Sequence, residues 1–199
     1  MTEVIQEQAT QEEAVQQVVI QQNVIQETAP ERVRPTTLEE YASGDESDLN
    51  VVLGWLGPAI DPETGGLAGP LPDTYIVAES NGWPKPEGEP VAAAINEVLL
   101  EDLWKRPGLL GAVFAVSEQN WHSGRALSIW TDEEALNGFL SSEGHRDAVR
   151  RMRDIAFEWE GIRWVSTSRE LPTFDEVRVR LAAQRAARRE AAREQDAAA

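Results

Sequence analysis

The sequence contains no cysteine and only two histidines, His122 and His145, among its 199 residues. The absence of cysteine excludes disulfides, thiolate zinc sites, iron–sulfur clusters and cysteine nucleophiles. Two histidines cannot by themselves build a three-histidine metal site. No apolar run approaches the roughly 20 residues that a membrane-spanning helix needs, and the first residues lack the basic and apolar regions of a signal peptide. We therefore expect a cytoplasmic protein.

Positive charge is also scarce, with 18 Lys and Arg against 35 Asp and Glu and a formal net charge of −17. Repulsion makes nucleic acid and anionic lipid poor partners for such a chain. The acidity lies in residues 1–107, which hold 20 acids and 5 bases, whereas residues 108–199 hold 15 and 13. The sequence also lacks a Walker A loop, a dinucleotide-binding fingerprint, a GxSxG elbow and an HExxH motif. Any chemistry must then come from a pocket that the fold supplies.

The first third of the chain is predicted to be an extension that precedes a folded domain. Residues 1–50 are rich in Gln and Glu, with Tyr41 as their one aromatic. Such a segment buries too little apolar surface to offset its ordering entropy, so we expect a disordered acidic tail. The alternative is that the β-branched stretch from Val15 to Ile25 docks on another surface. Residues 51–72 are predicted to form an irregular Pro/Gly loop with a short apolar strand at its start.

From residue 73 onward, strand and helix patterns alternate. Strands are predicted at 74–79, 109–116, 125–130 and 162–168, and helices lie between them at 91–103 and 131–160. The second helix is interrupted near Ser142, and its apolar stripe consists of His145, Val149, Met152, Ala156 and Trp159. The β–α–β–β–α–β order predicts an α+β, ferredoxin-like domain over residues 73–172 with a four-stranded antiparallel sheet. A C-terminal helix is predicted over residues 173–199. The hydroxyls of Thr131, Ser142 and Thr173 are the predicted caps at the starts of the helical segments.

The strand from Leu109 to Val116 is apolar on both faces. Both predicted helices nevertheless lie on the same face of the sheet. The other face should then be covered by something outside this unit, most simply by a second copy of the sheet. We therefore expect a homodimer.

One segment resembles a known family. The stretch from Leu127 to His145, LSIWTDEEALNGFLSSEGH, resembles the strand, Trp, acidic helix start, Phe and Ser-x-x-x-His of the antibiotic biosynthesis monooxygenase-like superfamily. The resemblance covers about residues 73–170 and implies a dimeric α/β barrel of ferredoxin-like units. The superfamily includes cofactor-independent oxygenases of polyketide quinone tailoring and haem-degrading monooxygenases.

The sequence departs from both catalytic patterns of that superfamily. The polyketide oxygenases have an Asn four residues before the strand Trp and a Tyr six residues after it, where this chain has Ala126 and Leu136. The haem degraders have a Trp–His pair, where this chain has Phe139 and Val149. His145 and the strand tryptophan remain.

These residues define a predicted site in which Trp130 and His145 border one cavity. His145 is the candidate catalytic base, because its unperturbed pKa near 6.5 suits proton transfer. Trp130, Ser128, Phe139 and Arg125 are the candidate substrate-binding residues. Three of them have a structural alternative: Trp130 as a core aromatic, His145 as a helix-start residue that bonds a loop, and Arg125 in a surface ion pair.

The predicted function is a small-molecule tailoring enzyme of the cofactor-independent monooxygenase type, acting on a planar, polyketide-like aromatic without metal or organic cofactor. Two alternatives remain open. One is a haem-binding oxygenase with His145 as axial ligand. The other is a non-catalytic dimeric binding or assembly protein whose acidic tail binds a protein partner.

Overall fold

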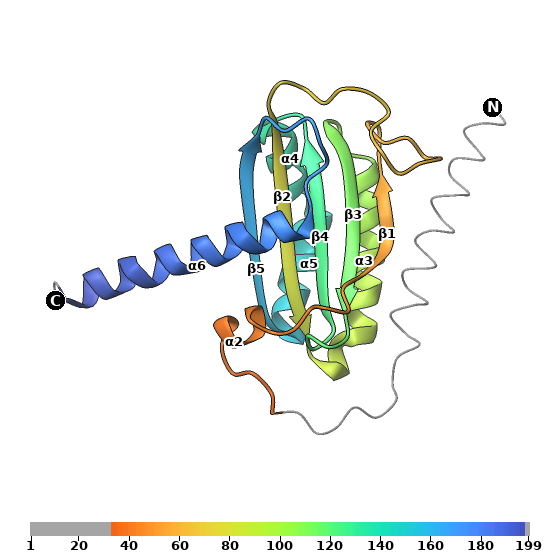
Figure 1. The fold of residues 1–199 in the computed structure, drawn as a ribbon. Helices are drawn as coiled ribbons and strands as arrows, with labels where there is room; N and C mark the ends of the chain where they lie inside the picture. Colours follow the sequence, from red (N-terminus) through yellow and green to blue (C-terminus); the bar gives the residue numbers. More distant parts are fainter. Residues whose placement is uncertain (1–32, 198–199) are drawn as a thin grey trace.

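A computed structural model of the chain describes residues 33–197 (Figure 1). Its elements follow in the order α2 (Leu38–Ala42), β1 (Asn50–Leu56), β2 (Tyr75–Pro84), the 3₁₀ turn η1 (Pro86–Gly88), α3 (Glu89–Trp104), β3 (Leu109–Ser117), β4 (Ser123–Trp130), α4 (Glu133–Leu140), α5 (Glu143–Ile155), β5 (Ala156–Ser166) and α6 (Phe174–Ala197). The expectations for residues 1–32, including the docking of Val15 to Ile25, lie outside these described residues.

All five strands pair antiparallel, in the spatial order β1-β3-β4-β2-β5. The predicted α+β order is confirmed by β2, α3, β3, β4, α4 with α5, and β5. The sheet has five strands rather than the four expected, because the apolar run at residues 51–56 pairs with β3 as an edge strand. Residues 50–56 thus belong to the sheet and not to a loop outside it.

The sheet carries an apolar core on each face. Side chains alternate along β4, so Trp130 points toward α3 and α4 while Leu127 and Ile129 point to the opposite face. The helices α3, α4 and α5 all lie behind the sheet in the view of Figure 1. The buried residues that surround Trp130 on this helix face are Leu53, Ile76, Leu100, Leu103, Leu109, Ala112 and Leu136.

Helix α6 covers the second face, where its first turns lie across β4, β2 and β5 (Figure 1). Val177 and Leu181 of α6 are buried in the same cluster as Leu127 and Ile129. The expectation of a homodimer rested on this face being left open by the chain. Helix α6 of the same chain covers this face, so the argument from an uncovered face no longer applies. Dimerisation stays a prediction.

The N-terminal extension is shorter than residues 1–50. Tyr41 of α2 is 2% exposed, and its ring lies 5.7 Å from the rings of Phe157 and Trp83. The Thr37 hydroxyl accepts a hydrogen bond from the backbone N–H of Glu40, which caps this short helix. The buried ring of Tyr41 holds residues 37–42 against the domain, a contact that the composition of the segment did not indicate.

Two helix boundaries also differ from the sequence prediction. Helix α5 ends at Ile155, and the stretch that includes Ala156 and Trp159 forms β5 instead of a further helical turn. Residues 156–166 pair with β2 over its whole length, which satisfies the backbone hydrogen-bonding groups on the side that faces β2. Helix α4 is capped by Asp132 rather than by the predicted Thr131. No helix among residues 33–197 is long and apolar enough to span a membrane.

Candidate functional site

Three rings are in contact where β4, α4 and α5 meet. Trp130, the last residue of β4, stacks on Phe139 of α4 with ring centroids 5.5 Å apart and an interplanar angle of 25°. Phe139 meets His145 of α5 edge to face, with centroids 4.9 Å apart and an angle of 65°. Aromatic pairs favour both of these geometries. The structure therefore brings together three of the side chains that the sequence singled out.

Trp130 and Ser128 lie inside the core. The Trp130 side chain is fully buried, and its indole N–H donates to Ser128 Oγ at 2.9 Å. The Ser128 hydroxyl donates to the Ala78 carbonyl at 3.3 Å. Both polar groups thus have partners without a ligand, as buried polar groups normally do. Trp130 reaches His145 only through the ring of Phe139.

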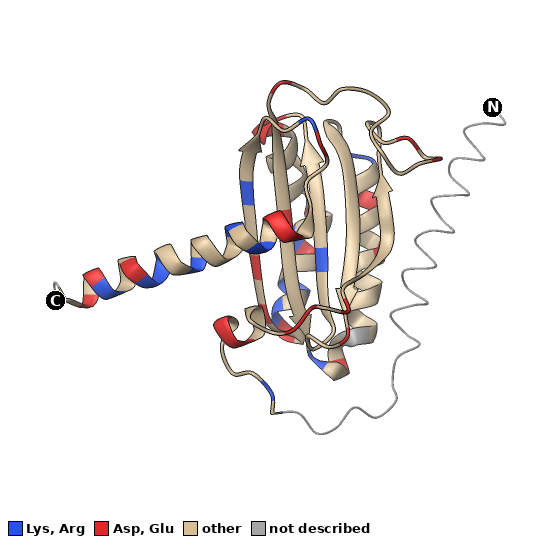
Figure 2. Ribbon diagram, viewed as in Figure 1, with Lys and Arg blue, Asp and Glu red and all other residues tan. Residues whose placement is uncertain are grey.

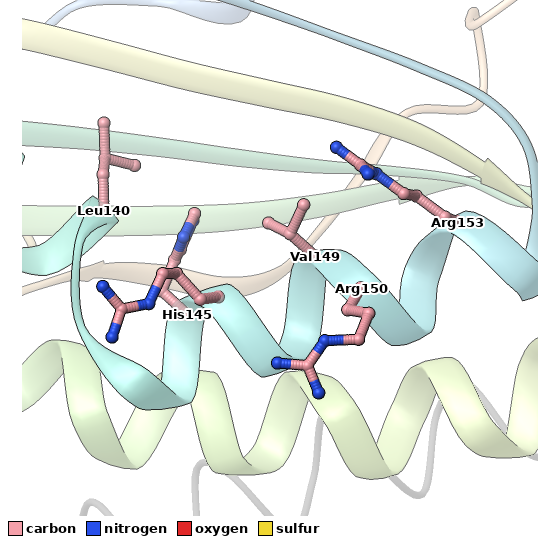
Figure 3. Close-up of a pocket in the computed structure, with 6 residues that line it drawn as sticks. Leu140, His145, Val149, Arg150 and Arg153 are labelled. Atoms are coloured by element: carbon pink, nitrogen blue, oxygen red, sulfur yellow. The ribbon is translucent and has the colours of Figure 1, made fainter.

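His145 lines an open pocket of about 450 Å³ beside α5, a size within the range of small-molecule sites. Of the predicted site residues, His145 alone lines this pocket. Figure 3 shows His145 and Val149 projecting to the same side of α5, with Leu140 pointing that way from the end of α4. The full set of lining residues is Leu140, His145, Arg146, Val149, Arg150 and Arg153.

The first turn of α5 fixes the position of His145. The Ser142 hydroxyl accepts a hydrogen bond from the His145 backbone N–H at 3.1 Å, which is the predicted cap. The same hydroxyl donates to Asp102 of α3 at 2.8 Å. Asp102 is also paired with Arg106, which lies just beyond the C-terminal end of α3. These contacts hold the start of α5 against α3 and so fix the position of the His145 backbone.

Burial lowers the pKa of His145 below its ordinary 6.5, because a half-buried imidazolium loses hydration. A hydrogen bond to the Leu140 backbone and the negative charge of Asp102 oppose this effect without cancelling it. The ring is therefore neutral at pH 7. A neutral imidazole has one N–H donor and one nitrogen that can accept a proton.

Arg125 lies on the opposite face of the sheet, away from the pocket. The alternation along β4 that turns Ser128 and Trp130 toward the helices turns Arg125 toward α6. Its guanidinium is buried and pairs with Glu46 at 2.9 Å and with Glu79 at 3.0 Å. The sequence offered Arg125 as a substrate ligand or as a surface ion pair, and the structure places it in a buried ion pair instead.

A cluster of buried polar groups surrounds Arg125 beneath α6. Burial raises the pKa of Glu79 to about 8, and the attraction of Arg125, shared with Glu46, only partly opposes this. Asn81 is 1% exposed, and neither atom of its side-chain amide has a partner among the described residues. Sequence reasoning missed this cluster, although Glu79 and Asn81 alternate along β2 on the face that carries apolar residues earlier in the strand.

The described residues hold no group of three or more His, Asp or Glu side chains that could bind a metal ion. The pocket residue His145 is accompanied by arginines, whose positive charge disfavours a bound cation nearby. The geometry at His145 thus suits proton transfer rather than metal ligation.

No family model matches the sequence, and no curated protein matches it. Solved structures of similar arrangement include a protein of Fusobacterium nucleatum provisionally described as a monooxygenase, with 14% identity and a TM-score of 0.44; the match spans 51% of this chain and 48%, about half, of that one. An antibiotic biosynthesis monooxygenase is 16% identical with a TM-score of 0.42, over 49% of this chain and 99% of the other.

SnoaB, a cofactor-independent oxygenase from Streptomyces nogalater, is 15% identical with a TM-score of 0.40, over 50% of this chain and 97% of its own. Likenesses as distant as these transfer neither a substrate nor a reaction to the chain. The antibiotic biosynthesis monooxygenase among these structures bears the name of the group that the segment from Leu127 to His145 resembles in sequence.

Proposed function

We propose that this chain is a small-molecule tailoring enzyme of the cofactor-independent monooxygenase type, acting on a planar aromatic substrate with His145 as general base. The observation that carries the proposal is the state of His145. A neutral, half-buried imidazole with a nitrogen ready to accept a proton lines a pocket of ligand size. General bases work best when their pKa lies near the working pH, and burial places His145 on the deprotonated side.

In this reaction the substrate itself supplies the electrons. His145 takes a proton from an acidic C–H of the substrate, and the resulting carbanion reduces O₂. For an activated methylene, one oxygen atom becomes the carbonyl oxygen and the other leaves as water, so R₂CH₂ and O₂ give R₂C=O and H₂O. The proton taken by His145 returns in that water. The protein then has to supply only a base and a surface that holds the substrate against it.

The neighbouring side chains keep the imidazole in place. The edge-to-face contact with Phe139 limits rotation of the ring, and Trp130 supports Phe139 from the core. Leu140 and Val149 offer apolar surface on the side of α5 where His145 projects (Figure 3). A flat substrate laid against these two side chains would bring its acidic carbon to the imidazole.

The test is oxygen consumption by the metal-free protein with anthrone as substrate. His145→Gln keeps most of the side-chain volume and should lower turnover by about 10²–10⁴-fold, the usual worth of a general base. His122→Gln changes the other histidine, in the turn between β3 and β4, and should leave turnover unchanged. Equal activity of His145→Gln and wild type would rule out His145 as the base. A haemin-dependent absorption band that is lost in His145→Gln would replace the proposal by the haem-binding alternative.

A further inference from the structure

The pocket beside α5 is cationic, although the chain as a whole is strongly acidic. Three of its six lining residues are arginines, and none is an Asp or Glu. Arg146, Arg150 and Arg153 follow one another at spacings of four and three residues, so they are neighbours on the surface of one helix. Like charges at these spacings repel one another and destabilise a helix. In a chain of net charge −17, such a group is not a consequence of overall composition.

Two of the three arginines have no partner within the described part of the chain. Arg150 pairs with Asp147 at 3.0 Å on the exposed surface of α5. The guanidinium groups of Arg146 and Arg153 form no ion pair and no hydrogen bond with any residue between 33 and 197. Other arginines are paired, as Arg125 is with two buried glutamates. Arg151, Arg188 and Arg193 also lack an ion pair within residues 33–197, but they do not line the pocket.

We propose that this pocket selects planar aromatic substrates that carry a carboxylate, with Arg146 and Arg153 as the residues that bind it. The inference rests on the proposed function for its choice of an aromatic, and on the unpaired guanidinium groups for the negative charge. A guanidinium matches the geometry of a carboxylate with two parallel N–H donors. A bound carboxylate also relieves the repulsion along α5.

The arrangement places the anion and the base on the same helix. Arg153 lies two turns beyond His145 and projects to the same side of α5 (Figure 3). At 1.5 Å rise per residue, eight residues separate them by about 12 Å along the axis. A carboxylate held at Arg153 therefore leaves room for fused aromatic rings along Val149, with the reacting carbon at His145.

The experiment compares binding of 2-naphthoate with that of its neutral methyl ester by titration calorimetry. We expect the carboxylate to bind at least about tenfold more tightly than the ester at low salt, and this preference to shrink as ionic strength rises. Arg146→Gln and Arg153→Gln should each lower affinity for 2-naphthoate severalfold and leave affinity for the ester unchanged. Arg151→Gln is the matched control, because Arg151 is an exposed arginine of α5 that does not line the pocket.

The proposal is overturned if the ester binds as tightly as the carboxylate, or if Arg151→Gln loses as much affinity as Arg153→Gln. Thermal melts of the variants separate a lost contact from a lost fold, since all three positions are exposed and should keep the wild-type Tm. Selective binding of 2-naphthoate without oxygen consumption by any aromatic acid would overturn the proposed oxygenase and uphold the anion site. Turnover of anthrone that aromatic acids do not inhibit would uphold the proposed oxygenase and overturn the anion site.

Discussion

The protonation state of a single residue, His145, decides when the proposed reaction runs. Its pKa lies below 6.5 because burial disfavours the imidazolium ion. General-base catalysis needs the neutral ring, so activity is lost as the pH falls through this pKa and is constant above it. We expect the pH profile of kcat/KM to show an acidic limb with a midpoint below 6.5, and the residual activity of His145→Gln to lack this limb.

Asp102 supplies a second test of the same assignment. Its negative charge raises the pKa of His145 and so opposes the effect of burial. Asp102→Asn keeps an acceptor for the Ser142 hydroxyl while removing the charge, so the acidic limb should move to lower pH. A limb that stays in place in both variants belongs to another group and contradicts the role given to His145.

Glu79 is a second residue with a shifted pKa, and its ionisation affects the stability of the fold rather than the pocket. Its folded-state pKa is raised from 4.5 to about 8, so between these values the folded protein holds a proton that the unfolded chain has released. Stability contributed by this group is therefore present below pH 4.5 and is lost as the pH rises toward 8. Glu79→Gln removes this dependence.

We expect the free energy of unfolding of Glu79→Gln, relative to wild type, to increase as the pH rises from about 5.5 to 8.5 in urea denaturation. Glu97→Gln, at an exposed position on α3, serves as the control for added or removed surface charge. If the difference for Glu79→Gln instead stays constant over this range, the carboxylate is ionised in the folded protein throughout, which contradicts the raised pKa.

At the scale of helices and strands, local signals were predictable from sequence and non-local ones were not. Ser142 and Thr173 were correctly identified as helix caps, because each hydroxyl binds a backbone N–H three residues away. The end of α5 was misplaced, since the helical spacing of Ala156 and Trp159 is real but pairing of β5 with β2 prevails. Such pairing depends on residues about 80 positions earlier, which no local pattern reports.

For the candidate site too, the local features were predictable from sequence and the non-local ones were not. The sequence correctly predicted that Trp130, Phe139 and His145 lie near one another, because all three belong to one continuous segment that resembles a known family. The arginines of the pocket were not identified, because Arg146, Arg150 and Arg153 look like the solvated side of an amphipathic helix. The buried ion pair of Arg125 was not predicted either, because its partner Glu46 lies in a segment that the sequence assigned to the tail.

For the molecule as a whole, helix α6 determines which side chains on the second face of the sheet are buried. Its first half buries Val177 and Leu181 in the apolar cluster and pairs Arg185 with the buried Glu160 at 2.7 Å. Residues 190–197 are exposed, and the helix extends beyond β5 with basic and acidic residues along its length (Figure 2). The two halves of one continuous helix thus have different roles.

Two truncations separate these roles. Deleting residues 190–199 should leave the Tm and the molecular mass in solution unchanged, because the described part of that segment makes no buried contact. Deleting residues 174–199 should expose the apolar cluster and leave Glu160 without its cation. We expect that shorter chain to self-associate through the uncovered sheet face, as measured by size-exclusion chromatography with light scattering. A truncated chain that stays folded and monomeric would contradict this, because an exposed apolar sheet face of this kind favours association with a second copy.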